Sequence, residues 1–287
     1  MNTPTPNRID KLNQLTTPLL EWYSSAARDL PWRTPASETH RPDPYHVWVS
    51  EIMLQQTRVE AVKGYYARFL TAFPNIKSLA NAPQDELMKL WQGLGYYSRA
   101  NNLKRAAIEI EERFHGEFPR TYQEILSLPG IGEYTAGAIA SIALGEAVPA
   151  IDGNVYRIYT RLFEDGSDIT KAAFKKQLRS ELLQTIPPGT PGIYNQAWMD
   201  LGATICQPNG APLCDKCPFT SRCQAHIHDS WSAFPVKPPK KKRRIEEKTV
   251  ILLEYQGTYL VQKRPPKGLL AGLWEFPSQE YGYTGCG

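Results

Sequence analysis

The 287-residue chain is poor in cysteine, with five in total and none before residue 206. Such sparse and clustered cysteine excludes a disulfide framework as the basis of the fold. No run of about 18 apolar residues occurs, so no membrane-spanning helix is expected. The first residues, MNTPTPNRID, lack the charged and apolar segments of a secretory signal. We therefore expect an intracellular protein, cytoplasmic in a bacterium, or nuclear or mitochondrial in a eukaryote.

A strong excess of charge is also missing, because the formal net charge is only +4. Residues 237–248 (KPPKKKRRIEEK) alone carry +5, so the rest of the chain is close to neutral. A nucleic-acid surface must therefore be local rather than a general basic field. The Pro- and Lys-rich stretch 235–248 has the composition of a linker.

Alternation of period two is almost absent before residue 230, which predicts an all-α fold for residues 1–234. Apolar spacing predicts helices over 8–27, 45–73, 83–92, 98–115, 121–127, 133–145, from 153 onward, 170–186 and 191–204. The pattern then changes, since TVILLEY, a QG turn and TYLVQKR predict a β-hairpin. A lone hairpin cannot bury a core. Residues 249–287 are therefore interpreted as the start of a second, α+β domain that is not completed.

Four of the cysteines, Cys206, Cys214, Cys217 and Cys223, fall within 18 residues in the pattern C-x7-C-x2-C-x5-C. Thiolates are soft ligands that suit zinc or an iron–sulfur cluster. Structural zinc sites more often use two C-x2-C pairs, and only one occurs here. The pattern thus favours an iron–sulfur cluster, although spacing alone does not decide between the metals.

Residues 128–139 (LPGIGEYTAGAI) place Gly130 and Gly132 between two predicted helices. Glycine permits positive φ and a close approach of the backbone, and a helix start presents free N–H groups. The loop is interpreted as a helix–hairpin–helix whose amides can bind a phosphate. An ordinary Gly-rich helix connection is the alternative.

Two carboxylates are candidates for catalysis. Asp152, in AIDGNVYRIYT, precedes a helix and fits either an N-cap or a carboxylate at the edge of a cleft. Glu51 lies at the border of the apolar stripe formed by Trp48 and Ile52, where partial burial would raise the pKa of a general acid. A helix-surface glutamate is the alternative for Glu51.

Polar and aromatic residues near these positions are candidates for contacts with DNA. Gln55, Gln56 and Thr57 follow Glu51 by one helical turn and face either a base stack or solvent. Tyr96 follows two glycines in QGLGYYSRA, and an exposed aromatic can insert between bases. Adjacent tyrosines are more often one core and one surface residue.

In combination, SEIMLQQTRV, QGLGYYSRA, LPGIGEYTAGAI, AIDGNV and the four cysteines resemble the MutY-type adenine DNA glycosylases. This family belongs to the helix–hairpin–helix superfamily that includes endonuclease III, and the resemblance covers residues 8–277. It implies a two-lobed core, with a six-helix barrel and a 4Fe–4S lobe held by the four cysteines. The implied partner is double-stranded DNA with adenine opposite 8-oxoguanine or guanine, bound by a monomer, and the implied reaction is excision of the flipped adenine.

The resemblance also implies roles for individual residues. Glu51 would protonate the adenine and then activate water, and Asp152 would stabilise the oxocarbenium-like sugar. Tyr134 and Asn154 would position Asp152 and the sugar. The base opposite the adenine would be contacted by Gln56, Thr57 and Tyr96. A phosphate would be bound by the backbone at Gly130 and Gly132. The hairpin after residue 249 would begin a Nudix-like domain that recognises 8-oxoguanine.

Two departures from the family stand out. Its first two cysteines are usually separated by six residues rather than seven, and the expected Nudix-like domain is mostly absent. The main alternative is an endonuclease III-like oxidised-pyrimidine glycosylase and lyase, which would have a lysine at position 134. A non-catalytic DNA-binding protein with a structural zinc is a second alternative. Tyrosine at 134 predicts a monofunctional glycosylase, because a phenol cannot form an imine with the sugar.

Overall fold

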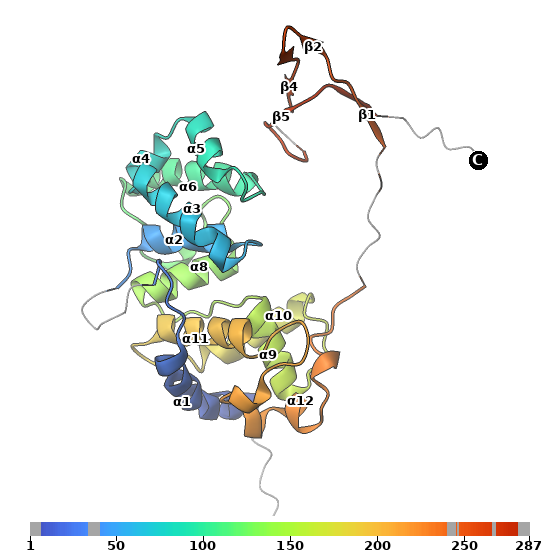
Figure 1. Ribbon diagram of the computed structural model, residues 1–287. Helices are drawn as coiled ribbons and strands as arrows, with labels where there is room; N and C mark the ends of the chain where they lie inside the picture. Colours follow the sequence, from blue (N-terminus) through green and yellow to red (C-terminus); the bar gives the residue numbers. More distant parts are fainter. Residues whose placement is uncertain (1–6, 34–40, 240–244, 246, 266–267, 281–287) are drawn as a thin grey trace, which may run out of the picture.

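The computed structural model describes residues 7–33, 41–239, 245, 247–265 and 268–280, and its core is helical, as predicted (Figure 1). Part of the linker and the last seven residues lie outside the described residues. None of the helices in the described ranges is both long and apolar enough to cross a membrane.

The first lobe, blue to green in Figure 1, is a set of helices around one hydrophobic core. Its members are α2 (Pro44–Leu54), α3 (Val59–Ala72), α4 (Ile76–Ala80), α5 (Gln84–Trp91), α6 (Ser98–Phe114), α7 (Tyr122–Leu126) and α8 (Glu133–Ile139), which continues into a π-helical turn, Ala140–Leu144. Trp48, Phe69 and Trp91 are fully buried there. Burying large aromatic side chains of this kind is a main source of core stability.

The second lobe joins the N-terminal helix to the later part of the chain. It contains α1 (Arg8–Ala26), α9 (Gly153–Phe163), α10 (Ala172–Leu183), α11 (Pro191–Thr204), α12 (Gln224–Ile227) and three 3-10 turns, Cys214–Lys216, Thr220–Arg222 and Trp231–Ala233. Its core surrounds Tyr159, Trp198 and Phe219. A small third cluster of Ala138, Ala150 and Met199 joins the two lobes beside Tyr134.

The predicted helix over 45–73 is wrong in one respect, because the chain breaks at residues 55–58 into α2 and α3. The buried guanidinium of Arg99 donates to the carbonyls of Ile52, Met53 and Gln55 at 2.9, 3.0 and 2.6 Å. These are orphan carbonyls at the end of α2, and a charged donor satisfies them. The break therefore depends on a residue more than forty positions away, which no local pattern reveals. The short helices α4 and α12 were also not predicted.

Six short strands occur in the described residues after 247, and their side chains are largely exposed. The predicted hairpin forms between β2 (Glu254–Tyr255) and β3 (Thr258–Tyr259). Its turn, Gln256–Gly257, has φ of 48° and 76°, as a tight hairpin requires. Two further antiparallel pairs were not predicted, β1 (Lys248–Val250) with β6 (Ser278–Glu280) and β4 (Gln262–Lys263) with β5 (Trp274–Glu275).

Candidate active site

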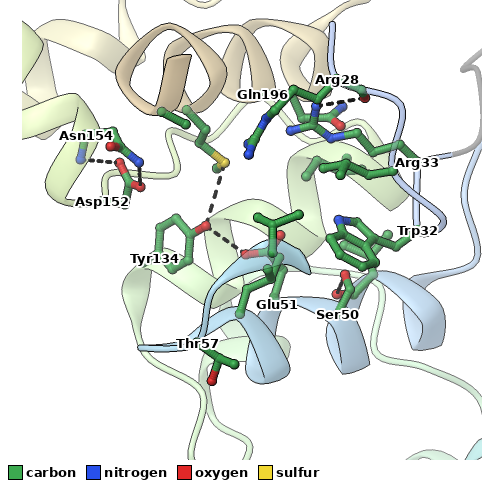
Figure 2. A pocket seen from close by; sticks show the side chains of 17 residues that line it. Arg28, Trp32, Arg33, Ser50, Glu51, Thr57, Tyr134, Asp152, Asn154 and Gln196 are labelled. Carbon is green, nitrogen blue, oxygen red and sulfur yellow. Dashed lines mark hydrogen bonds between the residues drawn. The ribbon is translucent and has the colours of Figure 1, made fainter. Parts of the chain in front are cut away.

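A cavity of about 210 Å³ lies where the two lobes meet, and it contains both predicted carboxylates (Figure 2). Glu51 reaches it from α2, Tyr134 from the first turn of α8, and Asp152 from the start of α9. The fold thus brings together three side chains that are far apart in sequence. Thr57 and Asn154 also line this cavity.

Glu51 is more deeply buried than its position at the border of the stripe suggested, with 7% of its surface exposed. Its Oε2 accepts a 2.7 Å hydrogen bond from the hydroxyl of Tyr134. Burial raises the pKa of Glu51, and the bond from Tyr134 and the charge of Arg33 offset only part of that rise. The raised pKa is what a general acid near neutral pH needs.

Tyr134 is placed differently from the expectation, because its hydroxyl bonds to Glu51 and not to Asp152. Its other close polar neighbour is the sulfur of Met199 on α11, at 3.6 Å. Burial and the nearby carboxylates raise the pKa of Tyr134 well above its ordinary value. The phenol therefore stays neutral and acts as a hydrogen-bond donor.

Asp152 is both the N-cap of α9 and a carboxylate at the edge of the cavity. Its Oδ1 caps α9 by accepting from the backbone N–H groups of Asn154 and Val155 at 2.8 and 3.0 Å. Its Oδ2 accepts from Nδ2 of Asn154 at 2.6 Å. Burial still raises the pKa of Asp152, although these hydrogen bonds lower it in part. The cap fixes the carboxylate at the edge of the cavity.

Behind Asp152, a buried arginine connects the cavity to the cysteine loop. Arg157 donates to Oδ1 of Asn154 at 2.8 Å and to the carbonyls of Gly202 and Cys206 at 2.8 and 2.7 Å. Arg157 thus links Asn154, whose side chain holds Asp152, to the backbone at the first cysteine.

Sequence reasoning missed an ion triad, centred on a buried aspartate, on the other wall of the cavity. Asp200 of α11 is fully buried and accepts from Arg28 and Arg33, with shortest distances of 2.5 and 2.6 Å. Burial alone would raise the pKa of Asp200, but hydrogen bonds from Arg33 and Arg28 bring this pKa below its ordinary value. The signal available in the sequence was the pair of arginines, Arg28 and Arg33, on either side of the apolar LPW segment. Asp200 itself gave none, since one aspartate in a helix is usually a surface residue.

A second cavity, of about 250 Å³, lies on the other face of the end of α2. It contains Gln56, Tyr96 and Gly130, three of the predicted DNA-contact residues, whereas Thr57 faces the first cavity. Gln56 and Tyr96 have φ of 58° and 47°, a conformation that non-glycine residues rarely adopt and that is concentrated at functional sites. Tyr96 is 60% exposed and lies beside the Arg99 guanidinium.

The two hairpin glycines differ in what they require. Gly130 has φ of 77°, and a Cβ there would lie 2.6 Å from Cβ of Asn102. Gly132 has φ of −100° and is the N-cap of α8, with open space where a Cβ would be. Glycine permits positive φ at both positions, but only Gly130 adopts it.

The four cysteines line one small cavity of about 30 Å³ in the second lobe. No group of three or more His, Cys, Asp or Glu side chains in the described part of the chain is arranged to hold a metal ion. The donor set nevertheless fits a cluster, whose four thiolate ligands bind different metal atoms. Arg161 donates to Sγ of Cys206 at 3.3 Å and is positioned to offset thiolate charge.

Residues 49–184 match the HhH-GPD superfamily base excision DNA repair proteins. The chain is 39% identical over 308 residues to the adenine DNA glycosylase of Homo sapiens, covering 91% of this chain and 56% of the human protein. It is 36% identical over 262 residues to the adenine DNA glycosylase of Buchnera aphidicola subsp. Schizaphis graminum, covering 91% of this chain and 73% of that protein. The chain therefore spans little more than half the length of the mammalian relatives.

Solved structures share the fold. A thermostable thymine-DNA glycosylase superposes with a TM-score of 0.67 and 27% identity, over 77% of this chain and all of that one. An endonuclease III trapped as a covalent intermediate with DNA gives a TM-score of 0.63 and 20% identity, over 78% of this chain and 99% of that one. At this identity the second likeness concerns the fold alone.

Proposed function

The chain belongs to the adenine DNA glycosylase family of the HhH-GPD superfamily, and we propose that it hydrolyses the N-glycosidic bond of adenine in double-stranded DNA. The proposed substrates are adenine opposite 8-oxoguanine and adenine opposite guanine. The observation that carries the proposal is the pair of carboxyls with raised pKa, the buried Glu51 and the half-buried Asp152, in one cavity with a neutral phenol at residue 134.

Glu51 has the environment of the acid. Among the described residues only Tyr134 bonds to its carboxyl, through Oε2, so Oε1 is left for the substrate. Protonated Glu51 would donate its proton to the adenine ring, at N7 by the family's assignment, and so make the base a better leaving group. The resulting carboxylate would then deprotonate the attacking water.

Asp152 has the environment of the stabilising carboxylate. Three hydrogen bonds from Asn154 and Val155 favour its ionised form and fix its position. A negative charge there would stabilise the positive charge that develops on the sugar, or bond to it transiently. Two carboxyls with these roles fit a retaining glycoside mechanism.

DNA contacts are proposed along the face that carries the second cavity. Gln56 and Tyr96 would contact the base left unpaired when adenine is flipped. The amides of the hairpin at Gly130 and Gly132, both exposed, would bind a phosphate. Thr57 lies near the catalytic cavity and would contact the flipped nucleotide or its neighbour. We propose that the protein binds the duplex as a monomer. We also propose that it acts inside the cell.

The cofactor proposal rests on the thiols. Cys206, Cys214, Cys217 and Cys223 would hold a 4Fe–4S cluster, which when bound would fix the loop from 206 to 223 rather than take part in hydrolysis. Residues 249–280 are proposed as the start of a Nudix-like domain, after a linker at 235–248.

The test is base release from three duplexes, with adenine opposite 8-oxoguanine, adenine opposite guanine, and thymine glycol. Release of adenine from the first two, with thymine glycol left intact, is expected. Release of thymine glycol together with strand cleavage would instead support the endonuclease III-like alternative.

A further inference from the structure

A fourth cavity, of about 770 Å³, lies directly beside the catalytic cavity. Four residues line both cavities, namely Arg28, Arg33, Ile142 and Gln196. These four residues are the wall that the two cavities share. Figure 2 shows Arg28 and Gln196 across the catalytic cavity from Thr57. We propose that this fourth cavity is an exit chamber through which the free purine base leaves while the DNA strand still closes the mouth of the active site.

This inference rests on the proposed function and concerns the release of the base after hydrolysis. A flipped nucleotide enters the pocket while its backbone remains continuous. After the bond is cleaved, the abasic sugar and its phosphates still occupy the entrance. The free base is then enclosed between the sugar and the wall. Its departure before the DNA dissociates requires a second opening.

The wall has one fixed half and one half that can move. Arg28 and Arg33 are both tied to the fully buried Asp200, so their positions are fixed. The side chain of Gln196, in contrast, makes one hydrogen bond within the described part of the chain, from Nε2 to the carbonyl of Gly192 at 3.2 Å in its own helix. Ile142 is apolar and only partly buried. A rotamer change of Gln196 therefore costs one weak bond and is fast compared with catalysis.

The chamber has a volume and a combination of polar and apolar side chains that allow a base to pass. Its volume is more than three times that of the catalytic cavity. Its lining includes hydroxyl side chains, such as Ser141 and Thr190, and the apolar side chain of Ile193. Such a lining can contact the edge and the face of a purine without holding it tightly.

The test uses substitutions that narrow the chamber and leave the four wall residues unchanged. Ala27→Trp adds an indole at the C-cap of α1, and Thr190→Trp adds one at the N-cap of α11. Both positions line the chamber and not the catalytic cavity. Ala67→Trp, on the exposed face of α3, is the matched control. The free base is 2-aminopurine, a fluorescent isomer of adenine, mixed in a stopped-flow instrument with protein already bound to a duplex that carries a tetrahydrofuran abasic analogue.

We expect both chamber variants to slow association and dissociation of 2-aminopurine together by roughly tenfold, which corresponds to about 1.4 kcal/mol of added barrier. The dissociation constant and the single-turnover rate of adenine excision stay unchanged, as for Ala67→Trp. Without DNA the mouth is open, so the slowing should disappear. A structural defect would instead change the dissociation constant or persist without DNA.

Unchanged exchange rates in the DNA complexes of both chamber variants would overturn the exit route while leaving adenine excision intact. Slowing that is equally large without DNA would also overturn it. Failure of the unmodified protein to excise adenine is a separate result, and it would overturn the function on which the exit route rests.

Discussion

The hydroxyl of Tyr134 donates a 2.7 Å hydrogen bond to Oε2 of Glu51, which joins the first turn of α8 to the last turn of α2. The donor favours the ionised carboxyl, and burial favours the protonated one. Burial is the larger effect, so the pKa of Glu51 remains raised. The tyrosine after the hairpin thus acts on the acid rather than on Asp152.

Glu51→Gln should abolish adenine release while the fold and DNA binding are retained, because glutamine keeps the shape but has no proton to donate. A positioned general acid typically contributes about 10²–10⁴-fold to the rate. Single-turnover excision from a duplex with adenine opposite 8-oxoguanine measures the loss. Glu60→Gln, on the exposed side of α3, is the control. A near-parental rate for Glu51→Gln would remove Glu51 from the mechanism.

The same substitution should also stabilise the protein, in a manner that depends on pH. The folded-state pKa of Glu51 lies above its ordinary value of 4.5. Between the two values the folded protein binds more protons than the unfolded chain, so the free energy of unfolding falls as pH rises through this window. Glutamine does not titrate. Urea unfolding should therefore show Glu51→Gln and the parent with similar stability near about pH 4 and the variant more stable near about pH 8. A difference that is independent of pH would contradict the burial argument.

Arg99→Lys should destabilise the first lobe by about 2–3 kcal/mol, because hydrogen bonds from a charged donor contribute about 1.5–3 kcal/mol and lysine cannot reach all of the carbonyls. Besides the end of α2, Arg99 donates to the carbonyls of Leu94 and Gly95 at 2.9 and 3.1 Å. The urea midpoint measures the effect, and Arg105→Lys on the exposed face of α6 is the control. Equal midpoints for the two variants would show that the α2–α3 break does not depend on Arg99.

The helical class and most helix bounds could be predicted from apolar spacing, because each amphipathic helix carries its own pattern. The α2–α3 break could not, since it is held by Arg99 from a distant helix. The partner of Tyr134 also depends on how α8 packs against α2. Asp200 was missed because its burial depends on two arginines that come from another segment. Local patterns therefore located the candidate residues, and long-range packing decided their partners.

Cys214→Ser should lower the iron content of protein purified without air, and with it stability, because a serine hydroxyl is a poor substitute for a soft thiolate. Cys286→Ser is the matched control, since this fifth cysteine lies far from the other four in sequence. Iron and zinc are quantified by elemental analysis and stability by thermal unfolding. Zinc without iron in the unmodified protein would refute the cluster and favour a structural zinc site.

Tyr134→Lys should give the protein some lyase activity. An amine at residue 134 can attack C1′ of the sugar and form an imine, which leads to strand cleavage by β-elimination. The neutral phenol of the unmodified protein cannot do so, and burial raises its pKa further above the ordinary value of 10. The lysine would lie beside Glu51 and Asp152, two carboxylates that favour its charged form, so only a modest gain is expected.

Borohydride trapping of a covalent protein–DNA adduct measures this gain, together with strand cleavage on a denaturing gel. The control is Tyr65→Lys, a tyrosine on α3 whose hydroxyl donates to the carbonyl of Gln92 outside the catalytic cavity. Trapping by Tyr134→Lys alone would place residue 134 within reach of C1′. Equally efficient trapping by the unmodified protein would show that another amine attacks the sugar, and would support the endonuclease III-like alternative.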